Sequence, residues 1–229
     1  MPDIDLKNQN DFFVPTPWDK KALGIDTYEL LEYTEEALEA ARKKSGHYTI
    51  KVDPLSSKKN FQKFGFYYCD TLIEPFCSIE KFKFWHSESV YIDKNVDVSE
   101  LLHIGSGSFK HGRFHRDFNV DKISADKRYD NWLRQLHKEG NVFGIFYEGK
   151  IVSFFGYSSE KIVLHSVIED IRGKGLAKYL WSAGCKELFE SGHRELTSSV
   201  SSSNVAIINL YSSIGFKFRN PLDVYHGLF

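Results

Sequence analysis

The chain has 229 residues, of which 41% are hydrophobic and 15% aromatic, so it can bury one large or two small cores. Lys and Arg number 30 against 31 Asp and Glu, a formal charge of -1 that excludes a global field for nucleic acid or an anionic membrane. The first residues lack the basic and apolar regions of a signal peptide, and no apolar run is long enough to span a bilayer. We therefore expect a cytoplasmic protein that binds neither nucleic acid nor membrane.

The three cysteines, Cys69, Cys77 and Cys185, are odd in number and lie in apolar surroundings. This pattern argues against a disulfide framework and lacks the ligand spacing of a zinc site. We expect buried free thiols in a reducing compartment and no metal.

Near the N-terminus, residues 26–32 alternate like a strand, and Thr34 is placed to cap a helix that ends at the basic residues 42–44. Strand alternation returns over 48–52. A polar helix is expected over 56–63, and the sequence Phe64-Gly65-Phe66 then leads into another strand. These elements predict a small α/β domain over residues 1–95, ahead of a larger domain over 96–229.

This order of elements occurs twice in the chain. Phe64-Gly65-Phe66 lies 150 positions before Ile214-Gly215-Phe216, and the strand at 48–52 falls near a second strand at 195–200. We interpret the N-terminal domain as a degenerate half-copy of the C-terminal one, with coincidence as the alternative.

Residues 105–117 are rich in glycine, aromatic and basic residues, and they separate a helix starting near Val98 from a helix over 124–137. Glycines give such a segment freedom, and arginine can fork onto phosphate oxygens. We therefore expect a substrate-binding loop. Its candidate contacts are Arg113, His115, Arg116 and Asp117. The alternative is a solvated connection whose arginines pair with Asp117 and Asp121.

Three strands are expected over 142–148, 151–157 and 161–168, and a helix begins near Leu176. Between the last strand and this helix, Gly173 and Gly175 allow backbone amides to converge at the helix N-terminus, which suits a pyrophosphate. The segment is not a nucleoside-triphosphate P-loop, because Lys174 is followed by Gly175 rather than a hydroxyl residue. It also lacks the third glycine of a dinucleotide fingerprint, since Lys178 stands there.

The strand at 195–200 is followed by a polar break at 201–204 and a short helix over 205–213 that ends at Ile214-Gly215-Phe216. The pattern Arg-x-x-Gly-x-Ala at 172–177, together with Asn204, Leu210-Tyr211 and Gly215-Phe216, resembles the GNAT superfamily of acyl-CoA-dependent N-acyltransferases. The resemblance covers roughly residues 141–229. It implies an α/β fold with a mixed, mostly antiparallel central sheet flanked by helices.

The resemblance also implies roles for individual residues. Tyr211 would protonate the departing thiolate, since a phenol stays protonated at neutral pH. Phe61, at the corresponding place in the proposed half-copy, has no proton to donate. The strand at 161–168 is expected to splay at its end and to bind pantetheine through its backbone. The residues expected at coenzyme A are Val167, Ile168, Arg172, Gly173, Lys174, Gly175, Leu176, Ala177 and Asn204, the last of which binds pantetheine or caps its helix.

The sequence leaves the identity of the general base open. His165 lies within the strand at 161–168 and His226 lies near the C-terminus. Either imidazole can accept a proton near neutral pH. A weakly basic sugar amine can also react without a dedicated base.

Shorter motifs extend the resemblance over nearly the whole chain. Pro17-Trp18-Asp19, Gly112-Arg113-Phe114, the Tyr129/Trp132 pair and Tyr225-His226 are similar to the TDP-fucosamine acetyltransferase branch. This branch implies a transferase that moves an acetyl or a short acyl group, hydroxylated or not, to a dTDP- or UDP-linked amino-dideoxy sugar, for bacterial surface polysaccharide biosynthesis. The alternatives are a protein or antibiotic amine as acceptor, or a noncatalytic domain that binds coenzyme A. A homodimer is left open.

Overall fold

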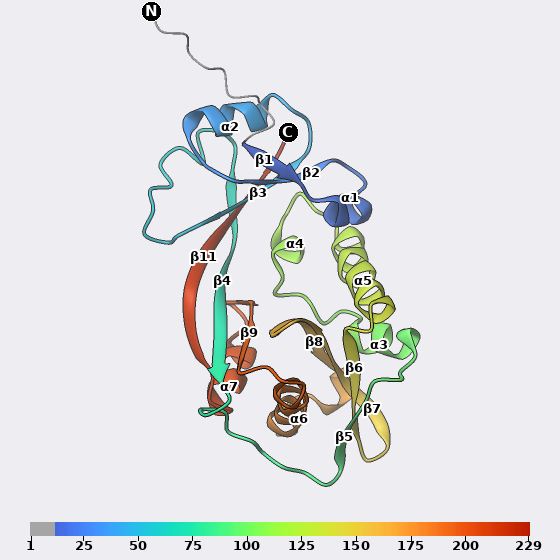
Figure 1. The fold of residues 1–229 in the computed structure, drawn as a ribbon. Coiled ribbons are helices and arrows are strands. Elements are labelled where there is room, and N and C mark those ends of the chain that lie inside the picture. The colour runs from blue at the N-terminus through green and yellow to red at the C-terminus, as the bar shows by residue number, and fades with distance from the viewer. Residues whose placement is uncertain (1–11) are drawn as a thin grey trace, which may run out of the picture.

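The strands form one continuous sheet that runs through the whole molecule (Figure 1). The computed structural model describes residues 12–229. Along the sheet the order is β1-β2-β3-β11-β4-β9-β8-β7-β6-β5, and β10 pairs with β4. The strands are β1 (Phe13–Pro15), β2 (Thr27–Leu30), β3 (His47–Val52), β4 (Tyr67–Ser78), β5 (Val90–Asp93), β6 (Val142–Tyr147), β7 (Lys150–Ser158), β8 (Lys161–Val167), β9 (Glu195–Ser198), β10 (Val200–Ser201) and β11 (Lys217–Leu228).

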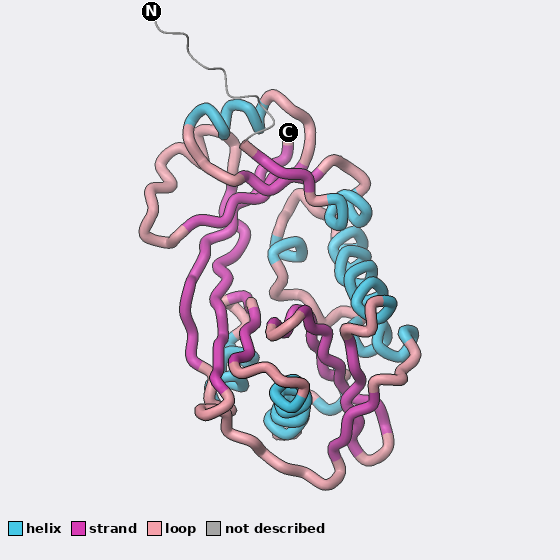
Figure 2. Tube along the Cα trace, in the orientation of Figure 1, coloured by secondary structure: helices cyan, strands magenta, loops and turns pink. Residues whose placement is uncertain are grey.

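Helices flank this sheet (Figure 2). They are α1 (Pro17–Leu23), α2 (Glu35–Arg42), α3 (Val98–Gly105), α4 (Arg113–Arg116), α5 (Lys122–Lys138), α6 (Ala177–Glu190) and α7 (Val205–Ser213), with a short 3-10 helix at Glu169–Ile171. Among the described strands, the pairs β2–β3 and β8–β9 are parallel and the others antiparallel. The predicted fold class, a mixed and mostly antiparallel sheet flanked by helices, is confirmed.

In the C-terminal half, neighbouring residues of β7 point to opposite faces of the sheet, as strand geometry requires. Phe154 packs into a core with α3 and α5, whereas Phe155 packs into a core with α6 and α7. Helix α6 approaches closely because Gly184 faces the Phe155 ring, where an added Cβ would lie only 2.8 Å from it. Helices therefore cover both faces here.

A separate core holds the N-terminal half together. It is built from residues between 12 and 66, with Tyr225 and Phe229 packed against it. Helix α2 begins where predicted, because the Thr34 side chain accepts a hydrogen bond from the Ala37 amide at 3.3 Å. Strands β4 and β5 already pair with strands of the C-terminal half. A domain division at residue 95 therefore stays a proposal.

The sheet has a pseudo-twofold arrangement about its two long central strands. β4 and β11 each span 12 residues and begin 150 positions apart. Each pairs antiparallel with the other, and each pairs on its outer side with a strand of the opposite half, β9 or β3. Beyond these strands, β2–β3 and β8–β9 are the two parallel pairs. Each half therefore places its last long strand, β4 or β11, beside a strand of the other half.

The backbone repeats this relationship at the Phe-Gly-Phe and Ile-Gly-Phe sites. The Phe66 amide donates to the Phe61 carbonyl at 2.9 Å, and the Phe216 amide donates to the Tyr211 carbonyl at 3.0 Å. Gly65 and Gly215 both have a left-handed backbone, with φ of 83° and 100°. The predicted repeat is therefore visible as geometry, while its origin as a half-copy stays a proposal.

The polar helix predicted over 56–63 is wrong, since this segment forms a series of turns. Local side-chain bonds compete with helix formation here. The Asp53 carboxylate accepts from the Leu55 amide at 2.7 Å, and the Lys58 ammonium contacts the Pro54 carbonyl and Asp223. The other predicted helices and strands form within a few residues of their expected bounds.

The three cysteines are buried and free, as predicted. No helix in the described part of the chain is long and apolar enough to cross a membrane.

Candidate active site

The turn between β8 and α6 is open at the surface. Residues Arg172 to Gly175 are exposed, and Gly173 and Gly175 have φ of 76° and 77°. An added Cβ at either glycine would meet no atom within 4 Å, so the left-handed backbone, and not crowding, calls for glycine there. The predicted cradle is thus not blocked by neighbouring atoms.

Helix α6 adds a second favourable feature to this turn. No side chain caps its N-terminus at Leu176, and the helix runs for 14 residues. The first amides of a helix have no intrahelical acceptor and carry the positive end of its dipole. An anion placed at this turn would therefore meet unpaired amide donors.

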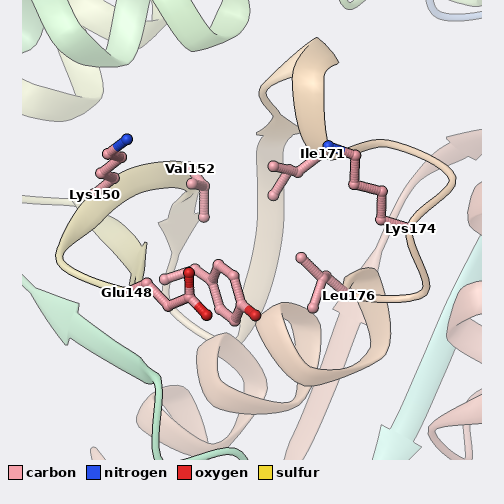
Figure 3. Close-up of a pocket in the computed structure, with 7 residues that line it drawn as sticks. Glu148, Lys150, Val152, Ile171, Lys174 and Leu176 are labelled. Carbon is pink, nitrogen blue, oxygen red and sulfur yellow. The ribbon is translucent and has the colours of Figure 1, made fainter.

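A pocket of about 440 Å³ lies beside the turn, between it and the β6–β7 hairpin (Figure 3). The apolar side chains of Val152, Ile171 and Leu176 face it, and Lys150 and Lys174 lie at its edge. Tyr147 and the carboxylate of Glu148 also line it, so the pocket combines an apolar surface with two lysines and one acid.

The strands β8 and β9 separate after a short parallel contact, as predicted. Their pairing is limited to Lys161 with Thr197 and Ile162 with Ser198. Beyond these pairs, β9 continues into β10, which joins β4. A splay therefore opens between residues 163–168 and residues 199–204.

Tyr211 lies at this splay, on the buried face of α7. Its ring centroid is 6.0 Å from that of His165 on β8, and its side chain is fully buried. Its hydroxyl interacts with Ser198 and Trp181, but neither it nor the buried indole N–H of Trp181 completes a hydrogen bond of good geometry with the described residues. Burial raises the pKa of Tyr211, so the hydroxyl stays protonated.

His165 is held between aromatic rings. Its ring lies 5.0 Å from Trp181 and 5.9 Å from Phe155. Desolvation lowers the pKa of His165 to about 4, so the imidazole is neutral at pH 7. The structure thus brings together Tyr211 and one of the two candidate bases.

The other candidate, His226, belongs to a different cluster. Its Nδ1 lies 2.7 Å from Asp117 Oδ2, and the His47 Nε2 lies 3.0 Å from the same oxygen. Tyr67 donates to Asp117 as well, at 2.9 Å. Burial lowers the pKa of His226 to about 4. Burial acts to raise the pKa of Asp117, but hydrogen bonds from both histidines outweigh it and hold that pKa well below its usual range.

His47, Asp117 and His226 are also a group with ligand atoms close enough to hold a metal ion, within 4.8 Å of one another. Their separations of 2.7 and 3.0 Å match hydrogen bonds between the imidazoles and the carboxylate. The absence of a metal stays an expectation for this chain.

The charged side chains of the predicted substrate loop have carboxylate partners inside the protein. Arg116 lies 2.6 Å from Asp70, and His115 lies 2.8 Å from Asp126. Arg113 lies 4.0 Å from Asp19. The expected alternative pairing with Asp117 and Asp121 does not form. Asp117 is engaged by the histidines, and Asp121 caps α5 through the Ser124 amide.

The same loop spans the splay. Ser108 accepts a hydrogen bond from Arg172 at 2.7 Å, at the β8–α6 turn. Three residues later, His111 Nδ1 lies 3.3 Å from the Ser203 hydroxyl, just before α7. Residues 105–117 therefore lie across both walls of the opening that contains Tyr211.

Two predicted backbone contacts already have partners within the protein. The Val167 carbonyl accepts from Arg172 Nε at 2.8 Å, and the Ile168 amide donates to the Val152 carbonyl at 2.8 Å. The Val167 carbonyl has a second lone pair, so pantetheine can bind it alongside Arg172. Asn204 caps α7, since its side chain accepts from the Ile207 amide at 3.3 Å.

One buried acid beside this opening was not singled out from the sequence. Asp70 lies on β4 and is bound by Arg116 and by Ser201 of β10. No local motif marks it, because its neighbours come from positions 46 and 131 residues away. Only the pairing of β4 with β10 places it there.

Comparison with known proteins agrees with this geometry. Residues 111–216 match the family described as Acetyltransferase (GNAT) family. No curated protein sequence matches the chain. The matched segment contains both the β8–α6 turn and Tyr211, and the solved structures share the fold of the chain.

Three solved structures illustrate the similarity of fold. A GCN5-related N-acetyltransferase from Sphaerobacter thermophilus superposes with a TM-score of 0.58 at 13% identity, over 80% of this chain and 60% of that one. A tandem GNAT protein from the clavulanic acid biosynthesis pathway gives 0.53 at 9%, over 88% and 75%. A glucosamine N-acetyltransferase region of a fungal multi-domain GH3 beta-N-acetylglucosaminidase gives 0.57 at 12%, over 93% and 30%.

Proposed function

We propose that this chain transfers an acetyl or short acyl group from coenzyme A to the amine of a dTDP- or UDP-linked amino-dideoxy sugar. The observation that carries the proposal is the open turn at residues 172–177, which lies beside a splay containing a buried tyrosine. One end of this site suits a diphosphate and the other suits a thioester.

The donor would bind along β8. Amides at the N-terminus of α6 would hold its pyrophosphate, and Lys150 and Lys174 would lie near its nucleotide end. Its pantetheine arm would enter the splay toward Tyr211. The Arg172 side chain, which now contacts Val167 and Ser108, would release one or both contacts to reach a phosphate.

Amide formation then needs three things: a neutral amine, a polarised thioester carbonyl and a proton for the leaving sulfur. Tyr211 supplies the proton, since its hydroxyl is protonated and is not already committed to another acceptor among the described residues. His165 lies close enough to this site to be considered as a base, whereas His226 is engaged with Asp117.

The acceptor would approach from α4 and the loop before it. This segment crosses the splay and carries three side chains that can be cationic, Arg113, His115 and Arg116. Arg116 is the exposed one of the three, and Arg113 has the longer separation from its carboxylate partner, 4.0 Å to Asp19, so these two are the candidates to meet a diphosphate. The nucleotide of an activated sugar would provide that diphosphate.

A screen of acyl-CoA donors against amine acceptors, read out as free thiol, tests the proposal. The acceptors are dTDP- and UDP-linked amino-dideoxy sugars, free glucosamine, a lysine peptide and an aminoglycoside. Glucosamine is included because the fungal region with a similar fold is described as acting on it. We expect the highest kcat/KM with a nucleotide-linked sugar.

Other outcomes of the screen point to other functions. Faster acylation of the peptide or the aminoglycoside contradicts the proposed acceptor class. Binding of coenzyme A without thiol release, for every donor and acceptor, indicates a noncatalytic domain instead.

A further inference from the structure

Asp70 is a buried carboxylate with one oxygen bound and the other free. Its Oδ1 accepts from Arg116 at 2.6 Å, from the Ser201 hydroxyl at 2.7 Å and from the Thr71 amide at 2.9 Å. Its Oδ2 is buried and has no hydrogen-bond partner among the described residues. The side chain as a whole is fully buried. Three donors thus fix the carboxylate and leave a single acceptor atom unused.

In the protein without a bound ligand, the unpaired Oδ2 of Asp70 destabilises the folded state. A buried polar atom without a hydrogen-bond partner destabilises the folded state, and more so when it is charged. Burial also raises the pKa of Asp70, although Ser201 and Arg116 oppose this effect. A group that donates an N–H to the free oxygen would remove this cost.

Asp70 is connected through its hydrogen-bond partners to both sides of the splay. Ser201 belongs to β10, which continues the β9 wall of the opening, and its hydroxyl also contacts Ser203 at 2.8 Å. Ser203 in turn contacts His111 of the loop that crosses the splay. Arg116 reaches Asp70 from α4, which follows this loop. Asp70 therefore lies between the β10 wall and the segment over which the acceptor would approach.

We propose that the free oxygen of Asp70 binds the acceptor's amino group and takes a proton from it. This inference rests on the proposed function and identifies the acceptor's reacting group as an ammonium. Asp70 is the catalytic base in this proposal, in place of either histidine.

The proposed transfer conserves atoms and charge. The R-NH₃⁺ acceptor gives one proton to Asp70 Oδ2 and becomes R-NH₂, whose lone pair attacks the thioester carbonyl. The C–N bond forms, the C–S bond breaks, and the sulfur takes the Tyr211 proton. The attacking nitrogen loses its second proton to water, water reprotonates Tyr211, and Asp70 releases its proton. The products are the amide, the free thiol and one proton released to solvent.

Several charged or titratable groups face Asp70 and set its protonation. Arg113 and Arg116 come from α4 and favour the ionised form, and the Cys69 thiol and the Tyr129 hydroxyl come from β4 and α5. Burial raises the pKa of both Cys69 and Tyr129, which stay neutral at pH 7. The two arginines are therefore the charges that keep Asp70 able to accept a proton.

The test compares wild type with Asp70→Asn across pH. Asparagine keeps the shape and an oxygen for Arg116, Ser201 and Thr71, but it cannot accept a proton. With acetyl-CoA and dTDP-4-amino-4,6-dideoxyglucose, we expect kcat/KM to fall by about 100-fold or more at pH 7. We expect the deficit to shrink as pH rises from 6.5 to 9, because solvent then deprotonates the amine. Calorimetric affinity for acetyl-CoA should stay within about twofold.

Two further variants provide a matched control and an independent second test. Asp223→Asn is the matched control on the neighbouring strand, where the carboxylate accepts from the Thr71 hydroxyl at 2.7 Å, and it should keep wild-type activity. Arg116→Gln retains Asp70 but removes its closest positive charge. The acidic limb of the pH–rate profile should therefore move to higher pH, which serves as the test if Asp70→Asn does not fold.

The outcomes separate this inference from the proposed function. An active wild type with an equally active Asp70→Asn, or with parallel pH profiles for the two, contradicts the role of Asp70 alone. A wild type that binds acetyl-CoA but acylates no amine contradicts both.

Discussion

Phe61 and Tyr211 occupy equivalent places in the two halves of the sheet. Each accepts the same pair of backbone hydrogen bonds, from the residues three and five positions later, with distances that agree within 0.1 Å. Both rings are buried. Tyr211 therefore differs from its counterpart mainly by a hydroxyl, and that hydroxyl completes no hydrogen bond of good geometry in the described structure.

We predict that Tyr211→Phe slows turnover by about 100-fold while leaving coenzyme A affinity nearly unchanged, because the proton matters in the transition state. The free energy of unfolding should stay equal or rise by up to about 1 kcal/mol, since the variant removes a buried hydroxyl that completes no hydrogen bond of good geometry. Thiol-release kinetics and urea unfolding measure these two effects.

Tyr48→Phe is the matched control for this variant. Tyr48 is also a buried tyrosine, but its hydroxyl donates to the Lys44 carbonyl at 3.0 Å. Its loss should cost about 1 kcal/mol of stability and leave turnover unchanged. A Tyr211→Phe enzyme with wild-type turnover removes Tyr211 from the mechanism.

Much of the fold could be predicted because local patterns determine it. The short segments around Gly65 and Gly215 repeat both their sequence and their hydrogen bonds. The exchange of β4 and β11 between the halves could not be predicted in the same way. It depends on pairings between residues about 150 positions apart, such as Tyr67 with His226 and Phe76 with Lys217.

Gly175→Ala should weaken coenzyme A binding. Alanine at φ of 77° is strained by about 1–2 kcal/mol, and relief of that strain would move the amides at the start of α6. Gly24→Ala is the control, because Gly24 has φ of 75° in equally open space at the end of α1. Both variants should lose similar stability in thermal unfolding. Equal coenzyme A affinity in the two would place the donor elsewhere.

Arg113→Ala should raise KM for the nucleotide sugar by about tenfold or more, with a smaller effect on KM for the acyl donor. Arg128→Ala is the control. Arg128 pairs with the same partner, Asp19, at 3.0 Å and lies over the same Phe114 ring, but it belongs to α5. Steady-state kinetics with each substrate varied will separate the two. Equal changes in both KM values for Arg113→Ala would exclude this side chain from the acceptor site.

Stability should fall as the solution is acidified below pH 6.5. His165 and His226 have pKa values near 4 in the folded protein, below the value of about 6.5 for an unfolded histidine. The unfolded chain therefore binds more protons between these values, and stability is lost as pH falls through the window. Each histidine contributes up to about 1.4 kcal/mol per pH unit. Urea unfolding at pH 7 and pH 5 measures the slope.

His226→Asn should reduce this slope, because it removes one of the two groups. An unchanged slope in both His226→Asn and His165→Gln would show that neither imidazole is buried neutral.

The candidate site was predictable where one segment forms it. The turn at Gly173 and Gly175 and the cap at Asn204 follow from nearby residues. The partners of Arg116 and His226 did not follow, since Asp70 and Asp117 reach them from distant strands and loops. Charge alone could not distinguish a phosphate-binding arginine from one with an internal carboxylate partner.

Calorimetric titration of the wild-type protein with acetyl-CoA and with acetyl-pantetheine tests most directly whether the turn at residues 172–177 holds a pyrophosphate. The two ligands share the thioester and the pantetheine arm, but acetyl-pantetheine lacks the diphosphate and the nucleotide. We expect acetyl-CoA to bind at one site per chain and acetyl-pantetheine to bind at least about 100-fold more weakly, since charge-assisted hydrogen bonds to the diphosphate are lost. No heat with acetyl-CoA, or equal affinity for both ligands, would contradict a pyrophosphate site at this turn.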